Sequence, residues 1–156
     1  MSDLIRSFTL SKNLVLGPRT DYLEVHKQMK KEEGVNIVAR TVLDEPASRL
    51  CVDGIRVISD VERLRRAPGS VTWVIALHCP QELRFGRALQ RKSGLDRFTF
   101  DEFLEDDRQD AYNPDPEHQN TLAVMNTADY HVDASKSQEL VLKEIDEIVV
   151  PILRVK

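Results

Sequence analysis

The chain has 156 residues, of which 41% are hydrophobic, and this is enough for one domain with an apolar core. The formal net charge of −4 argues against a protein that binds nucleic acid through its overall field. No apolar run is long enough to span a bilayer, and the first residues lack the layout of a secretion signal, so we expect a cytoplasmic protein with no membrane partner. Cys51 and Cys79 have no metal-ligand spacing and are expected to be reduced thiols in the core.

The first 46 residues predict helices. Residues 2–8 predict a short helix that needs packing to persist. A second helix is expected to begin at Thr20, which can cap it, and to end at Gly34. The apolar positions of residues 35–43 then follow helical spacing up to Pro46.

A short apolar run at residues 50–52 predicts a buried strand of a parallel sheet. Asp53, Gly54 and Arg56 follow it at the carboxyl end, the edge where open α/β sheets bind ligands. An acid there suits a hydrated Mg²⁺, and an arginine suits a phosphate. The same residues also fit an ordinary Asp-Gly turn followed by a solvated arginine.

Helices and strands alternate through the rest of the chain. Two capping boxes, Ser59-x-x-Glu62 and Thr99-x-x-Glu102, each predict the start of a helix, the first with Val61 and Leu64 inward. Such alternation predicts an α/β fold with a parallel sheet. The other expected elements are a strand at 71–77, a helix at 80–91 with Leu83 and Ala88 inward, a brief helix at 122–125, a strand at 130–132, and a helix at 137–149 with Leu140, Val141, Ile145 and Ile148 inward.

Several conspicuous residues have plain structural interpretations. Arg84 and the acidic residues of 101–107 predict solvated helix faces. Tyr130 and Trp73 are expected in the core rather than as platforms for a nucleotide base. The histidines at 78 and 131 have no metal-ligand spacing in the sequence and are expected to be structural.

Four motifs, in chain order, resemble those of P-loop nucleotide kinases, in particular the relatives of adenylate kinase and dephospho-coenzyme A kinase. The motifs are Ser2-Asp3-Leu4-Ile5-Arg6, Asp53-Gly54-Ile55-Arg56, the arginines 84, 87 and 91 before Gly94, and Ala128-Asp129-Tyr130-His131-Val132. A phenylalanine-to-arginine pattern at 103–108 adds to the likeness. Each motif is weak alone, and the order of all four makes the resemblance moderately specific.

The resemblance implies a three-layer parallel sheet of the P-loop nucleotide kinase type, lacking its first strand and P-loop. It implies a single domain, with acceptor-binding helices at 1–46, core at 47–91, a lid-like region at 92–118 and core again at 119–156. The implied cofactors are ATP and Mg²⁺. The implied partner is a nucleotide or another phosphorylated small molecule, rather than nucleic acid.

The resemblance also implies roles for individual residues. Asp53 would orient Mg²⁺ through water, and Arg87 and Arg91 would neutralise the phosphoryl group during transfer. Asp3, Arg6 and Arg56 would belong to the acceptor site, where Arg6 and Arg56 would bind the acceptor's phosphate, with Arg108 as a further cation at the substrate site. The central expectation is that Arg6, Arg56 and Arg91 converge around one phosphate.

No Gly-x-x-x-x-Gly-Lys-Ser/Thr loop occurs in the 156 residues. Either an upstream segment is missing from this chain, or the sheet is completed in another way. Two functions follow: an enzyme that transfers a phosphoryl group from ATP to a nucleotide, nucleoside phosphate or dephospho-coenzyme A, or a non-catalytic nucleotide-binding, phosphate-binding or assembly module of the same fold. An incomplete sheet would expose strand edges and favour a homo-oligomer.

Overall fold

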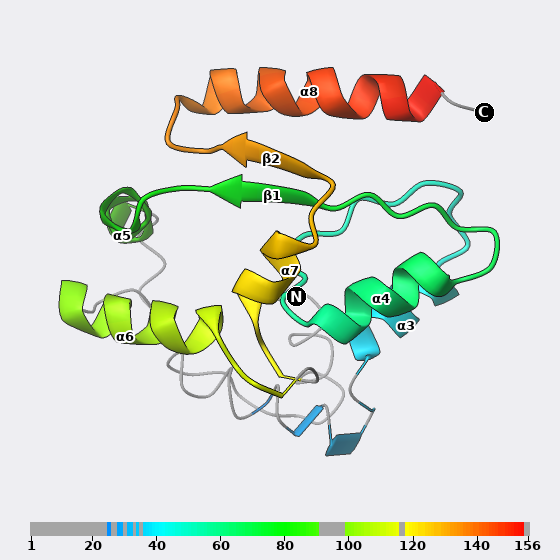
Figure 1. The fold of residues 1–156 in the computed structure, drawn as a ribbon, viewed down its shortest axis with the longest axis horizontal. Coiled ribbons are helices and arrows are strands. Elements are labelled where there is room, and N and C mark those ends of the chain that lie inside the picture. Colours follow the sequence, from blue (N-terminus) through cyan, green and yellow to red (C-terminus); the bar gives the residue numbers. More distant parts are fainter. Residues whose placement is uncertain are drawn as a thin grey trace. The chain divides into compact units, whose positions relative to one another are not determined.

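The computed structural model describes residues 36–90, 99–115 and 118–154, and positions 25, 28, 29, 31, 32 and 34. The chain divides into two compact units, Met1–Thr72 with Gln109–Val124, and Trp73–Arg108 with Met125–Lys156. None of the described helices is long and apolar enough to cross a membrane. The elements shown in Figure 1 are α3 (Ile37–Asp44), α4 (Ile58–Arg66), β1 (Ile75–His78), α5 (Gln81–Gln90), α6 (Phe100–Ala111), α7 (Thr121–Asn126), β2 (Tyr130–Asp133) and α8 (Gln138–Arg154).

The second unit is built on two parallel strands, β1 and β2, which lie side by side in Figure 1. Their register pairs Ile75 with Tyr130 and His78 with Asp133. A mixed helix-and-strand protein with a parallel sheet is therefore confirmed. β1 begins later than the sequence predicts, and Trp73, expected in the core, is half exposed, with its ring 6.0 Å from that of Tyr130.

Helix α8 covers one face of β2. Val132 is fully buried and packs with Val141, while Ile145 and Ile148 lie against the same cluster. Positions 141, 145 and 148 share one face of a helix, as predicted. The sequence also predicts Leu140 to point inward, but Leu140 is exposed, because it lies about 100° around the helix from its neighbour Val141.

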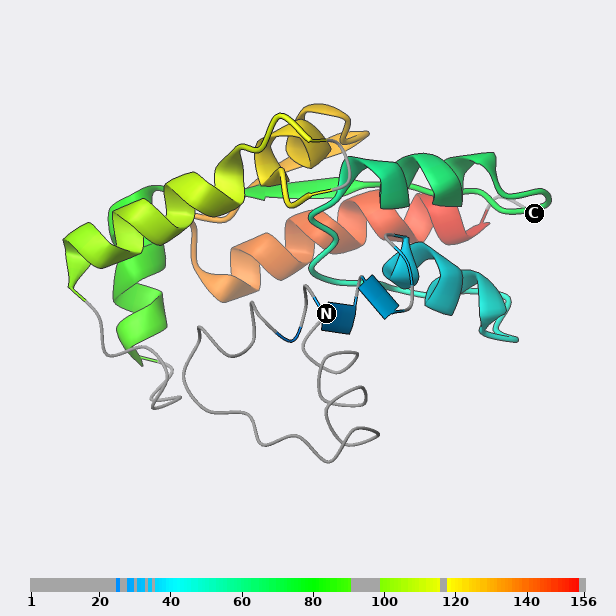
Figure 2. The ribbon, with the colours of Figure 1, turned by 90° about the horizontal axis from the view of Figure 1, so that it is seen from below.

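Helices α5 and α6 contact each other through aromatic side chains, and both lie in view in Figure 2. The ring of Phe85 lies 5.2 Å from that of Phe100 and 5.5 Å from that of Phe103. Leu83, predicted to face inward, is exposed, because Phe85 takes the position against α6. Helix α6 begins with the predicted capping box: the Thr99 N–H donates to the Glu102 carboxylate at 2.6 Å, and the Glu102 N–H donates to the Thr99 hydroxyl at 3.3 Å.

In the first unit, helices α3 and α4 are joined by polar groups at their amino ends. Asp60 is only 1% exposed, and its carboxylate accepts the backbone N–H of Ala39 in the first turn of α3 at 3.0 Å. The Ser59 hydroxyl donates to the Asn36 side chain at 2.7 Å. A buried carboxylate at a helix amino terminus satisfies an N–H that has no partner within the helix and is favoured by the helix dipole.

The capping box predicted at Ser59 is absent from α4. The residue before the helix is Val57, no side chain caps it, and Ser59 bonds to Asn36 instead. Glu62 pairs with Arg66 one turn later. The helix itself is confirmed, and so is its apolar face of Val61 and Leu64.

The strand predicted at residues 50–52 is wrong. These residues adopt no regular structure and are exposed, Leu50 by 47%, so Cys51 is an exposed free thiol and not part of a core. A buried parallel strand needs ladder partners and cover on both faces, and no strand of the described residues pairs with this run. Val57 is buried instead. Ile55 is partly buried and packs against a core cluster that contains Met29 and Val38.

We expect Asp60→Ala to lower the free energy of unfolding by about 1–3 kcal/mol, because it leaves the Ala39 N–H without its buried acceptor. Asp60→Asn keeps an acceptor oxygen and should cost less. Urea unfolding followed by circular dichroism measures both. Glu62→Gln, which removes only an exposed pair on the same helix, is the matched control and should change stability by about 0.5 kcal/mol or less. Equal stability of Asp60→Ala and Glu62→Gln would contradict this account.

The Thr99 capping box should make α6 sensitive to acid. Hydrogen bonds from the Thr99 backbone N–H and hydroxyl lower the pKa of Glu102 from its ordinary value of 4.5. The stabilisation is therefore complete above that value and is lost as the pH falls through the lower pKa of the folded state. Glu102→Gln should flatten the acid side of a plot of Tm against pH. Glu139→Gln, in the first turn of α8, should leave that plot unchanged, and a flattening of equal size in both variants would argue against the box.

Candidate functional site

The Asp53-Gly54-Ile55-Arg56 motif lies in a segment of the first unit without regular secondary structure. Gly54 has φ of 71°, in the left-handed region that favours glycine. Ile55 anchors the segment by packing against the core cluster, while Asp53 remains exposed. The motif thus presents a carboxylate and a guanidinium on a segment that one partly buried side chain anchors.

Arg56 is held at both its backbone and its side chain. Its carbonyl accepts the N–H of Asn120 at 2.8 Å, and Asn120 in turn caps α7 by accepting the N–H of Ala123 at 2.9 Å. Its guanidinium donates to the Asp110 carboxylate at 2.9 Å, with 42% of the Arg56 side chain exposed. An ion pair this exposed contributes about 0–1 kcal/mol. Arg56 is therefore well positioned, and its side chain remains partly exposed.

Arg87 lies in α5 and binds the loop that follows β2. Its guanidinium donates to the carbonyl of Ala134 at 2.7 Å and to that of Lys136 at 3.2 Å. The Ala134 N–H donates to the carbonyl of His78 at the end of β1, at 2.7 Å. The carboxyl ends of both strands and the last turn of α5 are thereby joined in one hydrogen-bonded corner.

Two other described arginines of the second unit, Arg84 and Arg108, have acidic partners. Arg84, predicted to lie on a solvated helix face, donates to both carboxylate oxygens of Asp107 and to the carbonyl of Cys79. The hydrogen bond to Asp107 raises the pKa of Arg84. Asp107 is therefore not the solvated acid that the sequence predicts. Arg108 pairs with Glu105 on the surface, and this pair raises its pKa.

The predicted site residues are only partly covered by the structure. Asp3, Arg6 and Arg91 lie outside the described residues, so the convergence of Arg6, Arg56 and Arg91 stays a prediction. Asp53 and Arg56 lie in one short segment of the first unit. Arg87 and Arg108 both belong to the second unit, where they bind different partners.

The described residues fit an acceptor phosphate better than they fit ATP. The guanidinium of the half-exposed Arg56 side chain is a group that can bind a phosphate, and the exposed Asp53 could hold a hydrated Mg²⁺ through water. Within the described ranges, no group of three or more His, Cys, Asp or Glu side chains is arranged to hold a metal ion. The glycine-rich loop that would hold the ATP phosphates does not occur in the 156 residues.

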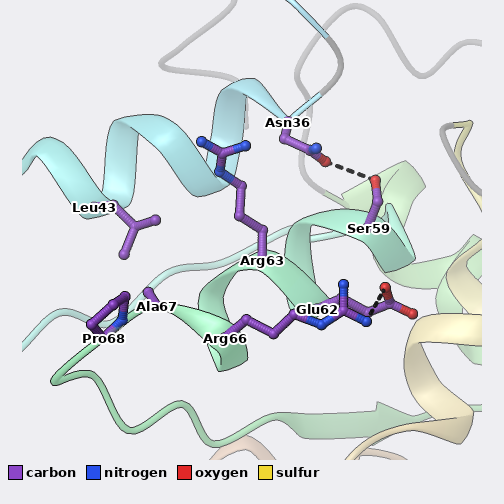
Figure 3. Close-up of a pocket in the computed structure, with 8 residues that line it drawn as sticks. All are labelled: Asn36, Leu43, Ser59, Glu62, Arg63, Arg66, Ala67 and Pro68. Atoms are coloured by element: carbon purple, nitrogen blue, oxygen red, sulfur yellow. Dashed lines mark hydrogen bonds and ion pairs between the residues drawn. The ribbon is translucent and has the colours of Figure 1, made fainter.

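A groove of about 450 Å³ lies between α3 and α4 in the first unit (Figure 3). Figure 3 shows Arg63 extending from α4 toward α3, and both Leu43 and Pro68 line the groove. Sequence reasoning did not single out this groove. The sequence feature that could have pointed to it is the set of arginines in the last turn of α4, where the helix dipole also favours cations. The lining residues are Asn36, Leu43, Ser59, Glu62, Arg63, Arg66, Ala67 and Pro68.

The fold and site define a mixed α/β protein with a parallel strand pair and a half-exposed, anchored arginine that follows an Asp-Gly pair. No family model matches the chain. It is similar to archaeal proteins: it is 28% identical over 160 residues to the UPF0200/UPF0201 protein of Archaeoglobus fulgidus, a match that covers 99% of this chain and 47% of that protein. It is 30% identical over 114 residues to the UPF0200 protein of Thermococcus gammatolerans, covering 69% of this chain and 60% of that protein.

The UPF0200 protein of Saccharolobus solfataricus gives a similar match, 25% identical over 114 residues, with 70% of this chain and 59% of that protein covered. The chain thus spans between 47% and 60% of the length of these three curated relatives. Their names state no activity.

Arg87→Ala should loosen the loop after β2, because it removes two hydrogen bonds from a charged donor to loop carbonyls. We expect amide exchange at Ala134 and Ser135 to quicken about fivefold, which corresponds to ~1 kcal/mol of local stability. Hydrogen exchange followed by NMR measures this effect. Arg108→Ala removes an arginine of the same unit that binds Glu105, and it should leave these two amides unchanged. Unchanged exchange in Arg87→Ala would show that the loop keeps its position without that arginine.

Proposed function

We propose that this chain forms part of a nucleotide or nucleoside-phosphate kinase-like protein, which transfers a phosphoryl group from ATP to a phosphorylated acceptor. The proposal includes the three-layer parallel sheet of P-loop nucleotide kinases. The described part would supply the acceptor-phosphate site and one side of the sheet. Because the chain covers less than two thirds of its relatives, the activity is proposed for the whole protein to which such a chain contributes.

The observation that carries the proposal is that Arg56 is anchored through its main chain while its side chain is partly exposed. Its main chain is fixed by Asn120, and it follows the acid and glycine of the motif that resembles the kinases' acceptor site. Phosphoryl transfer requires positioning and positive charge more than covalent chemistry from the protein. An anchored arginine supplies both.

The parallel strand pair supports the same proposal. β1 leads directly into α5, which carries Arg87, and β2 leads into the loop that Arg87 binds. Ligands of open parallel sheets bind at the carboxyl ends of the strands, where this corner lies. The free thiols of Cys51 and Cys79 suit a reducing compartment such as the cytoplasm.

A second function, a non-catalytic nucleotide-binding, phosphate-binding or assembly module, is favoured by one observation. The 156 residues contain no loop that would bind the β- and γ-phosphates of ATP. In this alternative the Arg56 site still binds a phosphorylated ligand. The two functions therefore share the site and differ in whether a phosphoryl group moves.

Titration with adenosine 5′-monophosphate and with adenosine tests the shared site. We expect the monophosphate to bind more tightly, and Arg56→Ala to weaken it by about 1.5–3 kcal/mol, roughly tenfold or more in Kd. Arg56→Lys should keep part of the affinity, because a point charge replaces a planar fork. Arg154→Ala, at the exposed end of α8, is the matched control and should bind as the parent does.

A transfer assay with ATP and the same monophosphate separates the two functions. Phosphoryl transfer would support the enzyme, whereas binding without transfer would support the module. Equal binding of adenosine and its monophosphate, or an Arg56→Ala variant that binds the monophosphate as tightly as the parent, would contradict both.

A further inference from the structure

A pair of histidines lies on one face of the parallel strands. Ala76 pairs with His131 and His78 pairs with Asp133, so these four side chains share one face of the sheet. His78 Nε2 and His131 Nδ1 are 2.8 Å apart, and their ring centroids are 5.0 Å apart. Both histidines are exposed. Two imidazole nitrogens therefore approach each other on adjacent strands, at a place open to solvent.

We propose that His78 and His131 form a two-point binding site for a divalent transition-metal ion of the Ni²⁺ or Cu²⁺ type. Neutral imidazole is a good ligand for these ions, and each ring contributes one nitrogen. Two metal–nitrogen bonds of about 2.0–2.1 Å at a right angle place their nitrogens about 2.9 Å apart. The separation in the structure is 2.8 Å, which already matches this spacing, and each ring would turn by about 45° from the line joining the two nitrogens to direct its lone pair to one ion. Since the described residues contain no metal-binding group of three or more ligands, water would complete the coordination.

The strands and their charges favour this site. Neighbouring strands hold both histidines in a fixed register, so little conformational freedom is lost when an ion binds. Asp133 is paired with His78 across the two strands, so its acidic side chain lies beside the histidine pair. The neighbouring cation, Lys136, is paired with Glu144 at 2.7 Å.

Ni²⁺ is the probe for calorimetry, because it does not oxidise the exposed thiol of Cys51 as Cu²⁺ could. We expect His78→Gln and His131→Gln each to weaken Ni²⁺ binding about tenfold or more, since even outer partners of metal ligands are worth 10–100-fold. The double variant should bind no more tightly than either single variant, because the chelate is lost with one donor. His118→Gln is the matched control: it removes an imidazole that bonds Asp115 in the first unit, and it should bind Ni²⁺ as the parent does.

Paramagnetic broadening by Ni²⁺ gives a second readout on the unaltered protein. The imidazole signals of His78 and His131 should broaden at the lowest Ni²⁺ concentrations, before that of His118. If the two rings serve only to hydrogen-bond each other, their variants would lose stability with no change in Ni²⁺ affinity, and this result would overturn the proposal. Broadening that reaches His118 first would overturn it as well.

Discussion

Two short parallel strands have little stability of their own, and the second unit depends on how β1 and β2 are fixed at both ends. At the start of the pair, the Val74 N–H donates to the Asp129 carboxylate and the Val74 carbonyl accepts the Asp129 N–H, each at 2.8 Å. At the far end, Ala134 bonds to His78 and to Arg87. The carboxylate of the Ala-Asp motif before β2 therefore helps to set the register of the two strands. The positions of the histidine pair and of the residues at the carboxyl ends of the strands all depend on that register.

Local signals in the sequence predicted the elements well, and long-range burial was predicted poorly. The Thr99 capping box was predicted correctly because both partners lie within one helical turn. The box at Ser59 failed because Asn36, 23 residues away in sequence, provides a competing acceptor. The strand at residues 50–52 failed for a similar reason, since an apolar run becomes a buried strand only where other strands pair with it. Apolar spacing alone does not contain that information.

The same limit applies to the candidate site. Residue type and motif order singled out Asp53, Arg56 and Arg87, and the structure gives Arg56 and Arg87 fixed positions. No sequence rule predicted that Arg84 would pair with Asp107, because 23 residues separate them. The acceptor of Arg56, Asp110, was missed because it lies 54 residues further along the chain. Partners of this kind become visible only when the chain is folded.

The arginines differ in how many hydrogen bonds each guanidinium already donates. The fewer such bonds an arginine makes, the more readily it can bind an anion. Arg84 donates to both oxygens of Asp107, and Arg87 binds two carbonyls, so an anion would have to displace two bonds at either residue. Arg56 makes one such bond among the described residues, in an exposed pair worth about 0–1 kcal/mol. A phosphate monoester carries about two negative charges and three acceptor oxygens, so it can exchange with the single carboxylate of Asp110 and engage the guanidinium fork through two bonds. Because Asn120 fixes the main chain of Arg56, that exchange requires the side chain alone to move.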